Sequence, residues 1–246
     1  MAAKGPANLP AAKTRRQRNQ LPSNSQNATT TNREKNPKKN EKGYQLNPQW
    51  LEEQREKTQQ RAQKYAQKTL FQQQASITAN SLYEVDSILL DLLSNQQPQS
   101  PNKEFLGLIW NHFWLPLFVS KKEYLKLKNL GQKFDLYAIS INKTPLDEWC
   151  TQFWNQIGGH AKIKYNPKIG QDFLVYPNTV IQVYYPKKIL QKLNQYYKKT
   201  KTIKQLDINQ LFEQIMLHPT PISITINQNQ TLANQLKNQI LNKFKK

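Results

Sequence analysis

Short strand-like stretches alternate with amphipathic helical stretches between residues 134 and 226, and this alternation restricts the folds open to the chain. Residues 161–165 alternate apolar and polar side chains, which is typical of a half-buried strand. Helices are predicted from Pro145 and from Pro186, because proline suits the first turn of a helix. Further strands are predicted at residues 134–142, 173–176, 179–185 and 222–226, of which 173–176 is either a separate strand or half of a bent one. The order β-α-β-β-α-(α)-β predicts an α+β fold with a ferredoxin-like, split βαβ core and additional helices.

Composition divides the chain into three parts. Residues 1–46 are rich in Ala, Pro, Asn, Thr, Lys and Arg and have almost no large apolar residue, so they are predicted to be a disordered basic arm. Residues 47–102 are predicted to form a helical segment and a linker, and the helices within 49–94 are available to a protein partner. Residues 103–246 are predicted to form the basic α+β domain.

The most hydrophobic stretch of the chain is residues 105–119, FLGLIWNHFWLPLFV. It is shorter than the roughly 20 residues that a membrane-spanning helix needs, so no transmembrane segment is predicted. A buried helix is the first interpretation. The alternative is an aromatic helix lying on an anionic membrane surface, with Lys121 and Lys122 at its end facing the lipid headgroups.

The chain carries 36 basic residues against 16 acidic ones, a net charge of +20. An excess of this size favours a polyanionic partner, which could be nucleic acid, an anionic membrane or an acidic protein. Cys150 is the single cysteine, so a disulfide framework within one chain is excluded, and we expect no secretory signal because the N-terminal stretch has no apolar core. We expect an intracellular location, either cytoplasmic or in the nucleoid or nucleus.

The helix that follows Pro186 separates its side chains into two faces. Ile189, Leu193, Tyr196 and Tyr197 fall on the apolar face, which places both tyrosines in the core. The opposite face carries lysines that are suited to phosphate groups, although a solvated helix face explains them equally well. We predict nucleic-acid contacts from three places: the arm, the open sheet face expected beside residues 160–164, and the lysine face of this helix. The predicted contacts are Lys13, Arg15, Arg16, Arg18, Lys162, Lys164, Tyr184, Lys187, Lys188, Lys192, Lys198 and Lys199.

Two of these groups have alternative interpretations. The arginine cluster in the arm is also compatible with a localisation signal. Tyr184 is either a ring that stacks on unpaired bases or a ring at the edge of the core.

No catalytic constellation is visible in the sequence. His112, His160 and His218 lie far apart, and none is spaced with another histidine or with Cys150 as metal ligands are. No glycine-rich phosphate loop occurs, so we predict no cofactor, no metal and no enzymatic activity, and the alternative is an enzyme whose active site is assembled from dispersed residues.

The sequence therefore predicts a non-catalytic nucleic-acid-binding protein that contacts phosphates, of single-stranded RNA or DNA, through its flexible arm and its basic domain. The alternative is a protein-interaction or scaffold module that associates with an anionic membrane surface through residues 105–119 and the flanking lysines.

Overall fold

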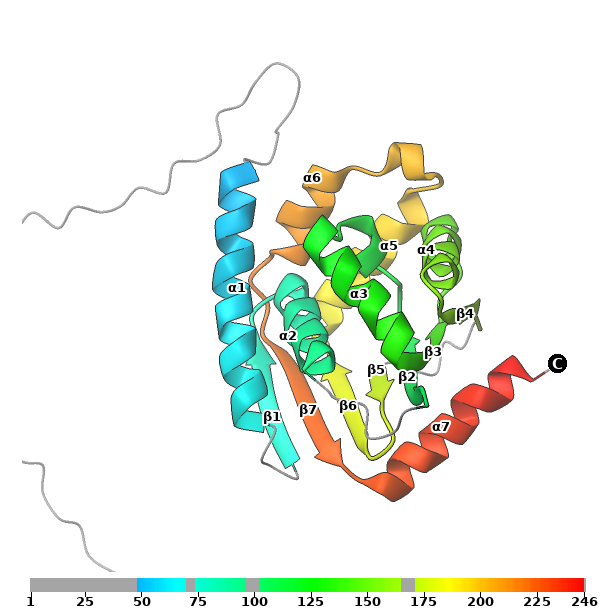
Figure 1. Ribbon diagram of the computed structural model, residues 1–246. Helices are drawn as coiled ribbons and strands as arrows, with labels where there is room; N and C mark the ends of the chain where they lie inside the picture. Colours follow the sequence, from blue (N-terminus) through cyan, green and yellow to red (C-terminus); the bar gives the residue numbers. More distant parts are fainter. Residues whose placement is uncertain (1–47, 70–73, 96–101, 165–170, 246) are drawn as a thin grey trace, which may run out of the picture. The chain divides into compact units, whose positions relative to one another are not determined.

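A mixed seven-stranded sheet organises the part of the chain that the computed structural model describes, residues 48–69, 74–95, 102–164 and 171–245 (Figure 1). The basic arm predicted for residues 1–46, with its arginine cluster, lies outside the described residues. The strands are β1 Gln74–Ala79, β2 Glu104–Trp110, β3 Phe134–Ser140, β4 His160–Ile163, β5 Asp172–Val175, β6 Thr179–Tyr184 and β7 Ile222–Gln228. The helices are α1 Pro48–Thr69, α2 Leu82–Ser94, α3 Lys121–Lys133, α4 Pro145–Gln156, α5 Lys187–Lys199, α6 Ile208–Leu211 and α7 Gln230–Phe244.

The strand order across the sheet is β1-β7-β6-β5-β2-β3-β4. β2, β3 and β4 are parallel and are joined through α3 and α4, while every other neighbouring pair is antiparallel. β2 therefore lies near the centre, parallel to β3 on one side and antiparallel to β5 on the other. The sequence encodes the helix starts locally: Ser120 and Glu123 form a capping box at α3, and the Thr144 side chain caps α4 ahead of Pro145.

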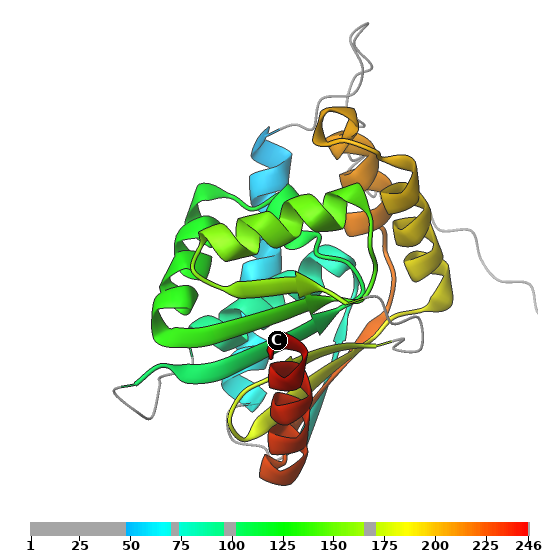
Figure 2. The ribbon, with the colours of Figure 1, turned by 90° about the vertical axis from the view of Figure 1, so that its right-hand side faces the viewer.

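Helices cover the two faces of the sheet unequally. Helices α2 to α6 pack on one face, which we call the main-core face, where they share a core with alternate residues of all seven strands. Helix α7 packs on the other, which we call the α7 face, against β2, β3, β5 and β6 (Figure 2). Its approach to β2 is close, because a Cβ atom at Gly107 would lie 2.6 Å from Ile240 Cδ1.

The ferredoxin-like core is not confirmed, although the α+β class is. The element order within residues 134–226 is the predicted one, and residues 172–175 form a separate strand. However, β3 and β4 pair directly with each other, whereas a split βαβ unit places another strand between its two parallel strands. The sheet is also larger, because β1 and β2 add strands from residues that were predicted to be helical or part of a linker.

Residues 74–95 belong to this sheet and its core, although the sequence placed them in a helical segment apart from the α+β domain. β1 pairs along its whole length with β7, and the apolar side chains of α2 are buried on the main-core face. The apolar face of α2 is therefore used within the chain and is not free for a protein partner.

The hydrophobic stretch 105–119 is strand β2 and the turn after it, so the predicted helix is wrong. Both faces of β2 are buried, because it is a central strand with helices on either side. The aromatic residues that would have met a membrane, Trp110, Phe113 and Trp114, are buried in the main core. None of the helices in the described part of the chain is long and apolar enough to cross a membrane.

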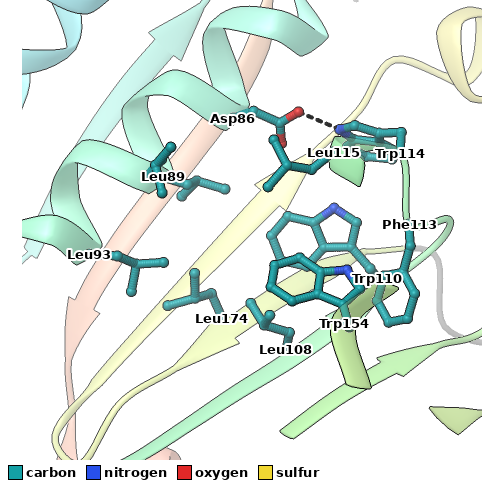
Figure 3. Close-up of a pocket in the computed structure, with 11 residues that line it drawn as sticks. Asp86, Leu89, Leu93, Leu108, Trp110, Phe113, Trp114, Leu115, Trp154 and Leu174 are labelled. Carbon is teal, nitrogen blue, oxygen red and sulfur yellow. Dashed lines mark hydrogen bonds between the residues drawn. The ribbon is translucent and has the colours of Figure 1, made fainter. Parts of the chain in front are cut away.

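A pocket of about 60 Å³ lies between α2 and the sheet (Figure 3). Its lining is apolar except for Asp86, whose Oδ2 accepts a hydrogen bond of 2.7 Å from Trp114 Nε1. Burial raises the pKa of the Asp86 carboxyl well above its ordinary value, and the hydrogen bond from Trp114 acts in the opposite direction. Because both side chains are buried, this contact joins α2 to the turn after β2 inside the core.

Candidate nucleic-acid interface

Helix α5 carries the densest group of exposed lysines on the main-core side of the sheet. Its apolar face, including Tyr196 and Tyr197, is buried, as the helical spacing predicted. Lys187, Lys188, Lys198 and Lys199 are exposed, and Lys192 is half-buried. The turn after the helix adds two exposed lysines that were not among the predicted contacts. We call the whole set the α5 lysine surface: Lys187, Lys188, Lys192, Lys198, Lys199, Lys201 and Lys204.

The charge of this surface is not compensated locally. Residues 173–206 contain these seven lysines and no Asp or Glu. Within the described ranges, the ion pairs involve other lysines, arginines and histidines, and none of the seven takes part in one. The ammonium groups are therefore available to an external anion.

Helix α5 is held against the end of the sheet by the loop that follows β2. His112 is buried and contacts Asp147 at the start of α4 through Nδ1, at 3.0 Å, and Asn194 of α5 through Nε2, at 2.7 Å. Tyr197, also in α5, donates a hydrogen bond of 3.0 Å from its hydroxyl to the Phe113 carbonyl oxygen. These buried contacts fix the helix that carries the lysines.

A second buried network fixes the chain just before α5. Asp172 is fully buried at the start of β5 and accepts hydrogen bonds from the Asn111 backbone N–H at 2.7 Å and from Asn111 Nδ2 at 2.6 Å. The Tyr185 hydroxyl donates to the same carboxylate at 2.9 Å, one residue before Pro186. Burial raises the pKa of Asp172 to about 7, and the hydrogen bonds from Asn111 and Tyr185 oppose that rise.

We expect the raised pKa of Asp172 to make the protein less stable as the pH rises from about 4 to about 7. In this window the folded state holds a proton that the unfolded state, with its ordinary pKa near 3.8, has lost. The contribution of Asp172 to the free energy of unfolding therefore falls by up to about 4 kcal/mol, at about 1.4 kcal/mol per pKa unit, and levels off above pH 7. Urea unfolding across this range measures the slope, and Asp172→Asn should reduce it. An equal slope in the variant would contradict the assignment.

The sheet residues predicted as contacts lie on the α7 face, opposite α5. Lys162 and Lys164 are exposed on and just after β4, and Lys162 Nζ lies 5.0 Å from the centre of the Phe244 ring in α7. Tyr184 is also on this face, 37% exposed, with its hydroxyl donating to Gln182 Oε1 at 3.1 Å. Three strands lie between β6 and β4, so at about 4.8 Å per strand Tyr184 lies roughly 19 Å across the sheet from Lys162 of β4.

The structure thus brings the five predicted lysines of α5 together and separates them from Lys162, Lys164 and Tyr184. The open sheet face expected from the sequence is crossed by α7, which covers its middle. His160, Lys237 and Phe244 on the α7 face were not predicted as contacts. The sequence could have identified Lys237 as a candidate contact, because residues 214–246 contain lysines but no acidic residue.

Among the described residues, no group of three or more His, Cys, Asp or Glu side chains is placed to hold a metal ion. Cys150 is buried, and burial raises the pKa of its thiol well above the ordinary value.

The fold and the surface together define an α+β protein with a mixed seven-stranded sheet and a lysine-rich helix at one end of it. No family model matches the chain, and no curated protein matches it. Among solved structures, the structure of this chain is similar to that of TrmBL2, an archaeal chromatin protein whose structure shows a novel mode of DNA binding. The two chains share 6% sequence identity, and the TM-score is 0.40. The match covers 80% of this chain and 62% of the other, so this chain spans less than two thirds of that protein's length.

Proposed function

We propose that this protein is a non-catalytic nucleic-acid-binding protein whose α5 lysine surface contacts phosphates. The observation that carries the proposal is a set of seven lysines, with no acidic residue among them, on a helix and turn that buried hydrogen bonds hold in place. The backbone of such a surface loses little conformational freedom when it binds, because the helix is already ordered. An intracellular location, in the nucleoid, the nucleus or the cytoplasm, follows from this ligand.

The dimensions of α5 suit a run of phosphates. A helix of 13 residues is about 20 Å long, which matches about six nucleotides at 3.4 Å per step. Each lysine that neutralises a phosphate releases a counterion, so binding should weaken as salt is added. No contact of this kind selects a base, so the α5 lysine surface should bind many sequences with similar affinity.

Neutralising the four exposed lysines of α5 should weaken binding and reduce its salt dependence. The variant carries glutamine at Lys187, Lys188, Lys198 and Lys199. The slope of log K against log[salt] should become shallower by up to about 0.9 per lost contact on duplex DNA and about 0.7 on single strands. Fluorescence anisotropy titrations with single-stranded RNA, single-stranded DNA and duplex DNA between about 50 and 200 mM salt measure this slope.

A matched control removes the same charge elsewhere. Lys57, Lys64, Lys121 and Lys128 are exposed lysines of α1 and α3, and replacing them with glutamine gives the same net charge as the α5 variant. We expect this control to keep most of the affinity and slope. If both variants lose affinity equally, the charge acts non-locally and α5 is not the contact surface. If the parent protein binds none of the three ligands at low salt, the proposed function is wrong.

A further inference from the structure

Three aromatic rings form a stacked row on the α7 face, across β2, β3 and β4. The rings of Phe105 and Tyr137 have centres 5.7 Å apart with planes 23° from parallel, and those of Tyr137 and His160 are 4.9 Å apart at 25°. The three residues come from three neighbouring strands, so the row runs across the sheet towards the β4 edge. Phe244 of α7 packs edge-on against this row, with its ring plane at 75° to that of Tyr137.

The row ends at an exposed ring. Exposure increases along it, from the buried Phe105 through the half-buried Tyr137 to His160, whose side chain is 56% exposed. β4 is the last strand of the sheet, and no strand among the described residues pairs with its outer edge. A flat group can therefore extend the row by stacking on the outer face of the imidazole. The Asp135 carboxylate holds the ring in place, because its Oδ1 lies 3.4 Å from His160 Nε2.

Cationic groups border the open end of the row. Lys162, two residues along β4, is exposed and held over the Phe244 ring, and Lys164 is exposed directly after the strand. Lys243 and Lys245 are exposed on either side of Phe244. The sequence stretches that contain β4 and α7 have no acidic residue between 149 and 171 or between 214 and 246, so the carboxylate recorded at this end of the row is Asp135 of β3. A flat ring acceptor and flanking cations are the two groups that a single-stranded nucleic acid requires.

We propose that the His160 edge is a second nucleic-acid site, which takes an unpaired base on the His160 ring and the adjoining phosphates on Lys162 and Lys164. The inference depends on the proposed function, since it assigns a second contact to the same class of ligand. A base must be free of its pairing partner to stack on this ring, so the site selects single strands. Because α5 lies on the other face of the sheet, one protein molecule holds two strands at the same time.

The test separates single-strand affinity from the capture of a second strand. His160→Ala, made in a full chain that already carries the four α5 substitutions, should lower the remaining affinity for single strands by about 10-fold and leave duplex affinity unchanged, since one stack is worth roughly 1–3 kcal/mol. His160→Phe keeps a ring at the end of the row and should retain the affinity. Trp50→Ala removes an exposed ring from α1, outside both proposed contact surfaces, and should have no effect. Equal losses for His160→Ala and Trp50→Ala, or none for either, would overturn the site.

Second-strand capture uses one biotinylated and one fluorescent oligonucleotide of unrelated, non-complementary sequence. Protein bound to the first on beads should retain the second. The variant with His160→Ala and Lys162→Gln should still bind the first strand through α5 and lose capture, and the α5 variant should lose capture while binding through the His160 edge. If the variant with His160→Ala and Lys162→Gln captures the second strand as well as the parent does, the second strand binds elsewhere and the inference fails. Failure of the parent to bind the first strand would instead reject the proposed function.

Discussion

Replacing Trp114 with alanine is expected to lower the free energy of unfolding by about 3–5 kcal/mol, because it empties a fully buried site. The indole packs against Trp110 and Tyr185, with ring centres 6.2 and 5.9 Å away. It lies beside an existing pocket, so the new space joins one that the core already leaves open (Figure 3). The change also removes the indole N–H that donates to the buried Asp86 carboxyl, and the loss of this partner adds to the cost.

One further variant separates the contributions of the Trp114 ring and its N–H group, and a second serves as an exposed control. Trp114→Phe keeps most of the ring but not the N–H group, so it should cost less than alanine, and about 1–3 kcal/mol of that cost should come from the buried acceptor. Trp50→Ala is the exposed control, since Trp50 is 38% exposed in α1, and it should change stability by less than about 0.5 kcal/mol. Urea unfolding followed by circular dichroism measures all three. A loss for Trp114→Ala no larger than that for Trp50→Ala would contradict the burial of this ring.

Asp147→Ala is expected to have a comparable effect, about 3–5 kcal/mol, because it leaves His112 buried without its carboxylate. The Asp147 side chain also accepts hydrogen bonds from Thr144 Oγ1 at 2.8 Å and Ser140 Oγ at 3.3 Å, so one substitution frees several buried groups. His112 is the residue that links this cluster to Asn194 of α5. The loss should therefore extend to the helix that carries the lysines.

The adjacent Glu148 provides the control for Asp147. It is exposed in the same helix turn, and its ion pair with Lys143 is 3.9 Å long, so Glu148→Ala should cost less than about 1 kcal/mol. Amide hydrogen exchange gives the second measurement. Residues 187–199 should exchange faster in Asp147→Ala than in Glu148→Ala, and binding should weaken in the former alone. Unchanged exchange in α5 would show that His112 does not hold this helix.

The sequence predicted local elements well where one physical signal dominated. Pro186 and the separation of lysines from apolar residues identified α5 and placed Tyr196 and Tyr197 in the core. β2 was mistaken for a helix because a strand buried on both faces has no alternating pattern to distinguish it from a buried helix. β1 was missed, although Ala75, Ile77 and Ala79 alternate with polar residues, as a half-buried strand does.

The arrangement of the candidate contacts could not be predicted, because it depends on pairing between distant strands. Nothing local to α7 indicates that it crosses the sheet face opposite α5. The ring row combines residues from β2, β3 and β4 and is bordered by Phe244, and these become neighbours only when the strand order is known. The charge pattern alone pointed to the lysine surface, because residues 173–206 contain lysines and no acidic residue, which can be seen without a structure.

The pairing of β1 with β7 has a consequence for synthesis of the protein on the ribosome. Of the described strands, β1 is synthesised first and its partner β7 is synthesised last, roughly 150 residues later. The parallel unit of β2, β3 and β4 can assemble early, while β1 and β6 keep open hydrogen-bonding edges until β7 arrives between them. A chain that stops before residue 222 therefore carries two unpaired edges, which are surfaces for aggregation. Completion of the sheet is a late event that depends on nearly the whole described chain.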